Sequence, residues 1–298
     1  MSARALVTGS TGFVGGALTR RLVQDGWEVD CVVRPSSNPE ALADLRTICG
    51  LRTHDGSTGQ LVSIIREANP DVVFHLASLF LVEHQPANVE DLIHSNVLFS
   101  TQLVEAMVRG GCKRLVNTGT SWQYYQTTEY RPVNLYAATK QAFEDILVYY
   151  HDAHDLSVVT LKLFDTYGPT DRRRKLINVL IDAAMSGERL DMSPGEQIVD
   201  LTHVDDVASA FLTASRLLRE SSQPLQGHFF VSGERYSVRE LVGVVEHATG
   251  RALNVCFGAR PYRSREVMVP ECARPRLPGW KIRVSLGQGL RQVVKSNG

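Results

Sequence analysis

The chain has 298 residues, of which 43% are hydrophobic, and its 32 basic and 32 acidic side chains cancel to a formal net charge of +0. This length allows a full hydrophobic core, and the balanced charge gives no electrostatic argument for binding nucleic acid or an anionic membrane. No apolar run approaches the ~20 residues that a membrane-spanning helix needs. The five cysteines form no CxxC pair and the N-terminus has no signal-peptide pattern, so we expect reduced thiols, a cytoplasmic location and a small-molecule partner.

The first motif combines a strand, a glycine turn and a helix. Residues 5–7 are apolar, residues 8–15 read TGSTGFVG, and residues 17–23 have helical spacing. In this context the first glycine allows a sharp turn, the second lets the backbone approach a pyrophosphate at the helix N-terminus, and the third lets helix and strand pack closely. The turn therefore predicts a dinucleotide site. The residues that we expect there are Gly9, Thr11, Gly12, Phe13 and Val14.

Arg34 follows the second predicted strand, which covers Trp27–Val33. At this strand end a Rossmann domain places the residue that reads the adenosine ribose. A carboxylate there accepts hydrogen bonds from the 2′-hydroxyl, whereas a guanidinium pairs with a 2′-phosphate. Arg34 therefore favours NADP (NADPH) as the cofactor. If Arg34 is only a solvated surface residue, NAD is the alternative, although the acidic competitor Asp30 lies earlier within the strand.

Strands and helices then alternate along the chain. We expect helices over 41–48, 61–68 and 89–107, and strands over 51–54, 71–78 and 114–118. This alternation, with a nearly all-apolar strand over 71–78, is typical of a doubly wound parallel α/β sheet. Asp55 and Gly56 lie at a strand end where they would meet the adenine, or Asp55 instead caps the next helix. The strand end that lets a cofactor lie across it consists of Leu76, Ala77 and Ser78.

A second constellation follows the strand over 114–118. Thr118 and Thr120 lie at its end, and Tyr136 and Lys140 come later at positions i and i+4 of a helical stretch, so they share one helix face. A phenol has a pKa of about 10, so acid or base work near neutral pH needs a downward shift of about 3 units. The Lys140 ammonium and an oxidised nicotinamide would supply that shift, and Thr120 would hold a substrate oxygen. The predicted catalytic residues are Thr120, Tyr136 and Lys140; Thr118 and the Tyr/Lys pair also face the cofactor.

Several segments in this order resemble the extended, sugar-nucleotide-modifying branch of the short-chain dehydrogenase/reductase superfamily, the NAD-dependent epimerase/dehydratase family. They are residues 8–15 (TGSTGFVG), 72–78 (VVFHLAS), the Tyr136/Lys140 pair, 164–169 (FDTYGP) and 200–208 (DLTHVDDVA). The resemblance covers nearly the whole chain. It implies a Rossmann domain over 1–168, to which segments around 199–235 return, and a mainly substrate-binding lobe over 169–298, with the nucleotide sugar between them.

The residues after Thr120 narrow the reaction that the resemblance implies. The 4,6-dehydratases of this family place an Asp-Glu pair directly after the catalytic threonine, but Ser121 and Trp122 follow here. Together with Gln123 and residues 132–137, this stretch is most similar to the CDP-paratose and CDP-abequose synthase group, which reduces a nucleotide-linked 4-keto-6-deoxyhexose with NADPH. We therefore expect Ser121, Trp122 and Gln123 to contact the substrate.

Further candidates lie in the predicted substrate lobe. Asn178 is near the position where that lobe contacts the nucleotide sugar in the family, and Arg263 resembles the arginine that grips the substrate diphosphate, with Arg265 as the alternative. The basic run over 172–175 is expected to be a solvated loop. The resemblance makes Asp205-Asp206 the cap and first turn of a helix over 207–218, and it implies no metal.

The leading hypothesis is an NADPH-dependent 4-ketoreductase of deoxysugar biosynthesis, in which Tyr136 protonates the alkoxide and Lys140 tunes Tyr136 and holds the nicotinamide ribose. The base of the nucleotide sugar, CDP or dTDP, stays open. An NAD-dependent nucleotide-sugar epimerase is the alternative, and a non-catalytic NADP-binding regulator, which typically loses the Tyr/Lys pair, is a third class. The family also suggests a homodimer through helices over 89–107 and 136–150, with apolar residues that include Ile93, Leu98, Phe143 and Leu147.

Overall fold

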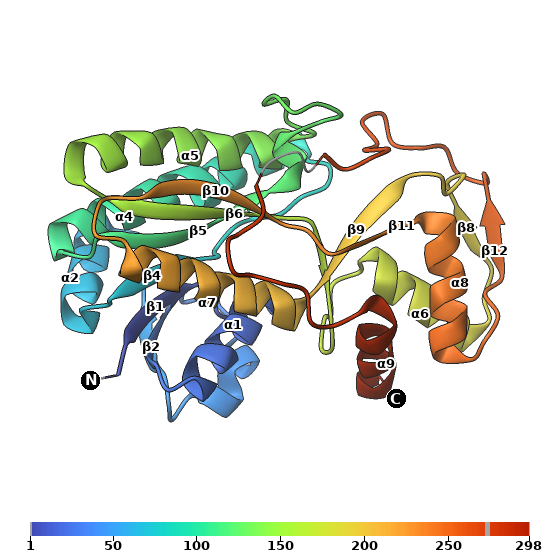
Figure 1. Cartoon of the computed structure of the whole chain (residues 1–298), viewed down its shortest axis with the longest axis horizontal. Helices are drawn as coiled ribbons and strands as arrows, with labels where there is room; N and C mark the ends of the chain where they lie inside the picture. Colours follow the sequence, from blue (N-terminus) through green and yellow to red (C-terminus); the bar gives the residue numbers. More distant parts are fainter. Residues whose placement is uncertain (1, 272–274, 298) are drawn as a thin grey trace.

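A parallel sheet of seven strands forms the centre of the computed structural model, which describes residues 2–271 and 275–297. The strand order is β3-β2-β1-β4-β5-β6-β10, and every neighbouring pair is parallel (Figure 1). The chain leaves β1 toward one edge and returns through β4 toward the other, so the topological switch point, where such sheets bind ligands, lies between β1 and β4. The strands are β1 (Arg4–Thr8), β2 (Glu28–Val33), β3 (Gly50–Thr53), β4 (Val72–His75), β5 (Arg114–Thr120), β6 (Ser157–Leu163) and β10 (Gln226–Val231).

Helices cover both faces of this sheet, which confirms the predicted doubly wound α/β class (Figure 1). Helices α1 and α7 pack together on one face, and α2, α4 and α5 pack on the other, so each face has its own apolar core. Because both of their faces are covered, the strands are mostly apolar, although β5 and β6 also carry buried polar side chains such as Asn117 and Lys162. No helix in the described part of the chain is long and apolar enough to cross a membrane. These helices are α1 (Phe13–Gln24), α2 (Thr58–Ala68), α4 (Phe99–Gly110), α5 (Leu135–His154) and α7 (Val204–Glu220).

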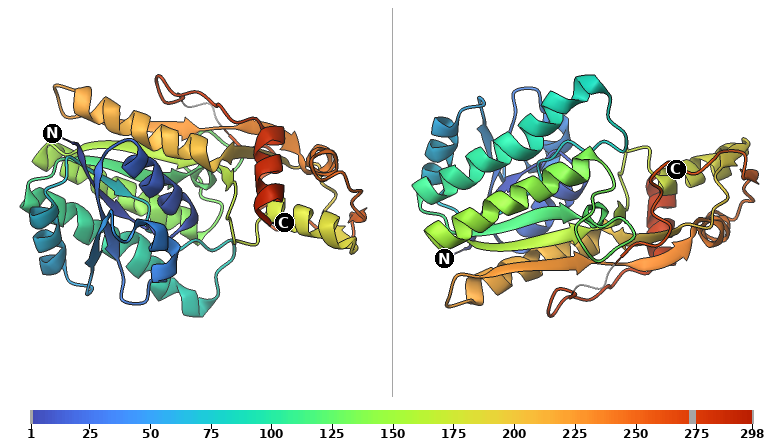
Figure 2. Two further views of the ribbon diagram at one scale, coloured as in Figure 1. Left: turned by 90° about the horizontal axis from the view of Figure 1, so that it is seen from below. Right: turned by 90° about the horizontal axis from the view of Figure 1, so that it is seen from above.

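A smaller group of elements lies at one end of the sheet, where β6 runs directly into β7 (Figure 2). It contains a three-stranded sheet in the order β11-β9-β7, a two-stranded sheet of β12 and β8, and three helices around a third apolar core. The elements are β7 (Asp165–Tyr167), α6 (Leu176–Ser186), β8 (Leu190–Met192), β9 (Ile198–His203), β11 (Glu234–Ser237), α8 (Val238–Thr249), β12 (Val255–Phe257) and α9 (Leu286–Asn297).

The helix predicted over 89–107 is interrupted. A π-helical turn at His94–Leu98 separates α3 (Val89–Ile93) from α4. Asn96 in this turn is fully buried, and its side chain accepts a hydrogen bond from the Leu79 backbone nitrogen (2.7 Å) and donates to Thr139 Oγ1 (3.0 Å). The π turn therefore brings a polar side chain to the loop after β4, a departure from regular spacing that is common at functional sites.

Two other helices differ from the prediction. The segment expected as a helix over 41–48 is instead 3₁₀-helical over Pro39–Leu45, with a kink at the non-helical Leu42 (φ −122°, ψ 22°). The helix expected from residue 207 starts at Val204 and is capped by His203. Asp206, expected to serve that cap and first turn, is buried, and its carboxylate accepts hydrogen bonds from the Arg283 and Val284 backbone nitrogens (both 3.0 Å). It thus anchors the segment that leads into α9.

Candidate active site

The glycine turn between β1 and α1 packs against the end of β4. Gly9 has a left-handed backbone (φ +75°), and a Cβ there would lie 2.5 Å from the backbone nitrogen of Ala77. A Cβ at Gly15 would collide with the Gly9 carbonyl. Helix α1 begins after Gly12 without a side-chain cap, which leaves the first amide groups of the helix to bind an anion. These residues, with Thr11, Phe13 and Val14 in the same turn, fit the pyrophosphate of a dinucleotide.

Arg34 lies directly after β2 and is exposed, and its guanidinium makes no ion pair with any residue that the structure describes. The competing carboxylate, Asp30, is in an ion pair with Arg52 through its Oδ1 (2.8 Å). Asp55 braces the turn before α2, since its Oδ1 accepts from the Ser57 backbone nitrogen (2.8 Å), while Ser57 itself caps the helix. Arg34 is therefore the charged residue at this strand end that remains available to a cofactor phosphate.

Hydrogen bonds tie the ends of β1, β4 and β5 together. Thr8 Oγ1 is bonded to His75 Nδ1 (2.8 Å) and also accepts from the Ala77 backbone nitrogen (3.2 Å), and Thr118 Oγ1 donates to the His75 carbonyl (2.8 Å). Burial lowers the pKa of His75 well below its ordinary value, so this ring stays neutral at pH 7. Leu76 and Ser78 flank Ala77, so the predicted cofactor platform is fixed to the glycine turn on one side and to β5 on the other.

Tyr136 and Lys140 lie one turn apart near the start of α5, which Asn134 caps. The two residues are 8% and 1% exposed. Burial raises the pKa of Tyr136 to about 12, against the opposing effect of a hydrogen bond with Ser78. Burial lowers the pKa of Lys140 to about 8, against the opposing effect of Glu144. The lowered phenol pKa expected from the sequence is therefore not a property of the chain alone, because loss of water around Tyr136 outweighs the hydrogen bond with Ser78.

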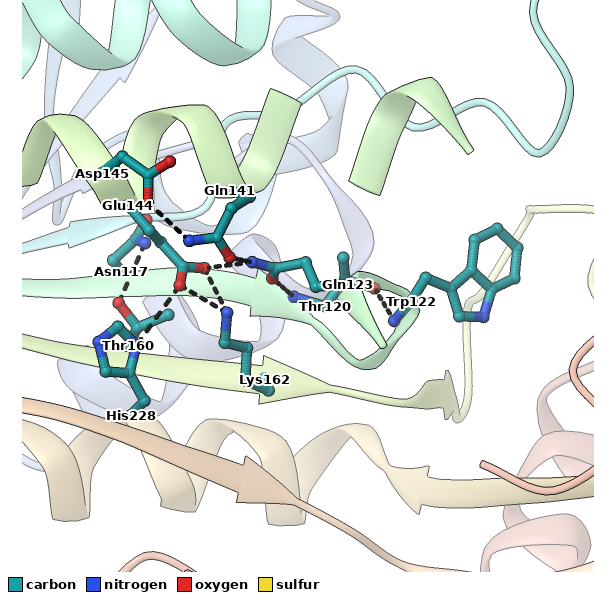
Figure 3. Close-up of polar contacts among 10 residues, drawn as sticks. All are labelled: Asn117, Thr120, Trp122, Gln123, Gln141, Glu144, Asp145, Thr160, Lys162 and His228. Atoms are coloured by element: carbon teal, nitrogen blue, oxygen red, sulfur yellow. Dashed lines mark hydrogen bonds and ion pairs between the residues drawn. The ribbon is translucent and has the colours of Figure 1, made fainter. Parts of the chain in front are cut away.

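Thr120 ends β5 and begins a turn that its own side chain stabilises. Thr120 Oγ1 accepts a hydrogen bond from the Trp122 backbone nitrogen (3.3 Å), and its hydroxyl hydrogen has no acceptor in the part of the chain that the structure describes. Gln123 Oε1 accepts from the Thr120 backbone nitrogen (3.1 Å). The Gln123 side chain, which the sequence suggested as a substrate contact, is fully buried and lies toward Gln141 and Glu144 (Figure 3).

Phe80 is a site residue that the sequence analysis missed. Its ring lies against Tyr136 (centroids 5.0 Å apart, T-shaped) and against Trp122 (5.5 Å), and the Lys175 ammonium lies 4.1 Å from its centre. Phe80 thus links the proposed proton donor to the turn after Thr120. It follows the VVFHLAS motif by two residues, and a lone aromatic in a loop gives no signal of this contact.

A cavity of about 530 Å³ lies between the turn after Thr120 and the C-terminal elements. Its size suits a small organic ligand. Ser121 and Trp122 line it from the Rossmann side, and Met192 and Arg263 line it from the other side. Among the described residues that form the wall, Gln123 and Asn178 do not appear; Asn178 instead donates to the Asp171 and Arg173 carbonyls (2.7 and 2.8 Å) and braces the basic loop.

Both candidate arginines of the C-terminal segment border this cavity, but they are engaged differently. Arg265 donates to the carbonyls of Pro132 and Val133 (2.8 and 2.9 Å), and its guanidinium lies 4.2 Å from the centre of the Tyr125 ring. Among the residues that the structure describes, Arg263 has a long ion pair to Glu266 (3.7 Å) as its side-chain partner, and its side chain is 52% exposed. Arg263 is therefore the freer of the two to bind a substrate diphosphate.

A dinucleotide-type glycine turn, a Tyr/Lys pair one helical turn apart and an adjacent cavity define an oxidoreductase-type enzyme. The family model "NAD dependent epimerase/dehydratase family" matches residues 5–229, and the chain belongs to this family. It is 26% identical to a CDP-abequose synthase of Salmonella muenchen over 98% of this chain and 97% of that protein. It is also 26% identical to a UDP-glucose 4-epimerase of Mycolicibacterium smegmatis, again over 98% of this chain and 97% of that protein.

Among solved structures, the UDP-glucose 4-epimerase of Thermus thermophilus in complex with NAD matches with a TM-score of 0.82 and 26% identity, over 98% of both chains. This agreement confirms the Rossmann-type fold. The family and these relatives together identify the chain as a sugar-nucleotide-modifying enzyme of the oxidoreductase type that uses a nicotinamide cofactor.

The buried Lys140 predicts a pH-dependent stability. Because folding lowers the pKa of this ammonium from 10.5 to about 8, its buried charge destabilises the fold below about pH 8, and this penalty fades as the pH rises toward 10.5. We expect Lys140→Met to exceed the wild type in free energy of unfolding by on the order of 2–3 kcal/mol at pH 7 and by less than half of that at pH 9.5. Urea unfolding without cofactor measures both values. The exposed Lys281→Met is the control, and a Lys140→Met difference that does not change with pH would contradict the prediction.

Proposed function

We propose that the chain reduces the C4 keto group of a nucleotide-activated 4-keto-6-deoxyhexose with NADPH, in deoxysugar biosynthesis, and that Tyr136 donates the proton. The turn after Thr120 carries this proposal. Ser121 and Trp122 border the cavity there, and no carboxylate stands directly after Thr120, where the family's dehydratases have an acidic pair. The identity of 26% with a CDP-abequose synthase over nearly the whole chain supports the same class of reaction.

The protonation states of the buried pair suit a reduction. A phenol with a pKa of about 12 holds its proton at pH 7, which is the form needed to protonate an alkoxide at C4. Lys140, with a pKa of about 8, is mostly charged at pH 7 and would stabilise the phenolate left after that transfer. Thr120 would donate its free hydroxyl hydrogen to the C4 oxygen, and bound NADPH would supply the hydride.

The lining of the cavity supports proposed roles for the remaining candidates. Ser121 and Trp122 would contact the sugar and Arg263 the diphosphate, because all three border the cavity. Gln123 and Asn178 would act indirectly, since their side chains hold neighbouring segments rather than the cavity wall. An NAD-dependent nucleotide-sugar epimerase is the second candidate, favoured by the 26% identity with the Thermus enzyme solved with NAD.

The direct test is a screen of CDP- and dTDP-linked 4-keto-6-deoxyhexoses for NADPH oxidation. We expect turnover with one of these substrates, and Tyr136→Phe should lower it by about 10²–10⁴-fold while leaving the Kd for NADPH nearly unchanged, because only the proton donor is lost. The exposed Tyr130→Phe is the matched control and should retain full activity. Near wild-type turnover in Tyr136→Phe would remove this residue as the acid. Tightly bound, oxidised NAD in the purified protein would instead support the epimerase.

The second test examines whether Arg34 determines the choice between NADPH and NADH. If its guanidinium pairs with the 2′-phosphate, Arg34→Ala should weaken NADPH binding by roughly 10- to 150-fold and leave NADH binding unchanged. Arg34→Asp should favour NADH, because a carboxylate repels the phosphate and accepts from the ribose hydroxyls. Titrations of both cofactors against all three proteins give the answer. Equal losses for NADPH and NADH, or a wild type that prefers NADH, would make Arg34 a surface residue.

We also propose a homodimer through α3–α4 and α5. Phe143 and Leu147, two of the apolar residues named for this interface, are instead buried against the chain's own sheet, at 0% and 1% exposed. Ile93, Leu98 and Tyr149 remain exposed on the same helices, which supports an interface there.

Sedimentation at micromolar concentration should show a dimer that Ile93→Glu with Leu98→Glu converts to a monomer, because the paired carboxylates would be buried in the interface. Val269→Glu, which changes an exposed apolar residue outside these helices, should leave the dimer intact. A monomeric wild type would refute the proposed interface.

A further inference from the structure

Glu144 and Lys162 form a buried ion pair next to the turn that follows Thr120. Lys162 Nζ on β6 donates to Glu144 Oε1 on α5 (2.6 Å), and the two side chains are 0% and 3% exposed (Figure 3). His228 on β10 lies on the solvent side of this pair, with its Nδ1 3.4 Å from Glu144 Oε2 and its side chain 34% exposed. Burial alone would raise the pKa of Glu144, but His228 and Lys162 together lower it, so Glu144 is a carboxylate.

The pair fixes the direction of the hydrogen bonds that reach Thr120. Lys162 can only donate and the Glu144 carboxylate can only accept. Glu144 Oε1 therefore selects the amide nitrogen of Gln123 (3.0 Å), and this choice turns Gln123 Oε1 toward the Thr120 backbone nitrogen (3.1 Å). The charge on Glu144 thus favours the orientation of the Gln123 amide in which the oxygen meets the Thr120 backbone nitrogen.

The backbone next to Thr120 fits tightly against the same pair. Gly119 is paired with Lys162 in the β5–β6 register. A Cβ at Gly119 would lie 2.7 Å from Lys162 Cδ and 2.9 Å from Glu144 Oε1. The ion pair therefore occupies the space of the missing side chain, and it contacts the catalytic strand end directly as well as through Gln123.

Stability alone does not explain this arrangement. A buried ion pair replaced by apolar side chains of similar size is often neutral or more stable, whereas removing one partner leaves a costly buried charge. What an apolar pair cannot do is orient the Gln123 amide. We propose that Glu144 and Lys162 are positioning residues that hold Thr120, Ser121 and Trp122 in place for the substrate, an inference that rests on the proposed role of Thr120 in the reductase.

The test compares single and paired substitutions. Lys162 donates to both oxygens of Glu144, so Glu144→Gln places an amide nitrogen beside the Lys162 ammonium, removes the negative charge and disturbs the acceptor that Gln123 shares. In the double variant Glu144→Leu with Lys162→Met the buried charges are gone, and we expect a melting temperature within about 5 °C of the wild type. Gln141→Leu is the control, because Gln141 is a second, partly exposed acceptor for Gln123 (2.7 Å).

We expect the double variant to keep its NADPH affinity and to lose about 10- to 100-fold in kcat, because a displaced Thr120 no longer holds the substrate oxygen. In the double variant, amide hydrogen exchange at Thr120, measured without substrate, should become at least about tenfold faster. The exchange rates of α7 and β9 should stay unchanged. Gln141→Leu should lose less than about threefold in kcat, since the Glu144 contact remains. Glu144→Gln should match the double variant in kcat if it folds.

If the double variant matches the wild type in stability, in kcat and in the rate of amide exchange at Thr120, the proposal is overturned, since the pair would then be only structural. A loss in Gln141→Leu as large as in the double variant would also overturn it. Because hydrogen exchange needs no substrate, faster exchange at Thr120 in a protein that reduces no 4-keto sugar would sustain the positioning role and refute the reductase instead.

Discussion

The close approach of β1 and β4 at the glycine turn is the constraint on which the site depends. Gly9 packs against the backbone of Ala77, and the neighbouring Thr8 is bonded to His75 in the middle of the sheet. Thr118 then bonds the His75 carbonyl from β5. These hydrogen bonds link β1, which precedes the glycine turn, through β4 to β5, the strand that ends in Thr120. A side chain at position 9 would therefore shift the proposed catalytic strand as well as the cofactor turn.

Much of this architecture could be predicted from local sequence. The glycine spacing, the apolar strands and the i, i+4 pair each report on contacts within a few residues, and the resulting fold class is confirmed. The interruption at Asn96 could not be predicted, because a π turn changes the helical period that the reasoning assumes. Gln123 was predicted to face the substrate but lies toward Glu144, since its direction depends on a partner twenty-one residues away on another element.

The protonation of the site likewise depends on long-range contacts. Tyr136, Lys140 and Glu144 follow one another at single-turn intervals on α5, so the helix alone predicts a phenol, an ammonium and a carboxylate on one face. Burial of all three could not be predicted from that spacing. Lys162, which the β5–β6 register places beside Gly119, pulls the pKa of Lys140 down while Glu144 raises it. The resulting value of about 8 is thus the balance of desolvation, Glu144 and Lys162, with desolvation the largest influence.

Hydrogen bonds connect the two sides of the cavity near the turn that contains Trp122. Arg265 from the C-terminal segment grips the carbonyls of Pro132 and Val133, and the Val133 backbone nitrogen donates to the Trp122 carbonyl (2.8 Å). A second link runs from Gln126 Nε2 to the Glu266 carbonyl (3.5 Å). The turn that contains Trp122 is therefore fixed by two sets of hydrogen bonds. One runs through Gln123 to Glu144, and the other runs through Val133 to Arg265. Because Arg263 lies two residues from Arg265, the proposed diphosphate site belongs to the same segment that is hydrogen-bonded to the loop beside Trp122.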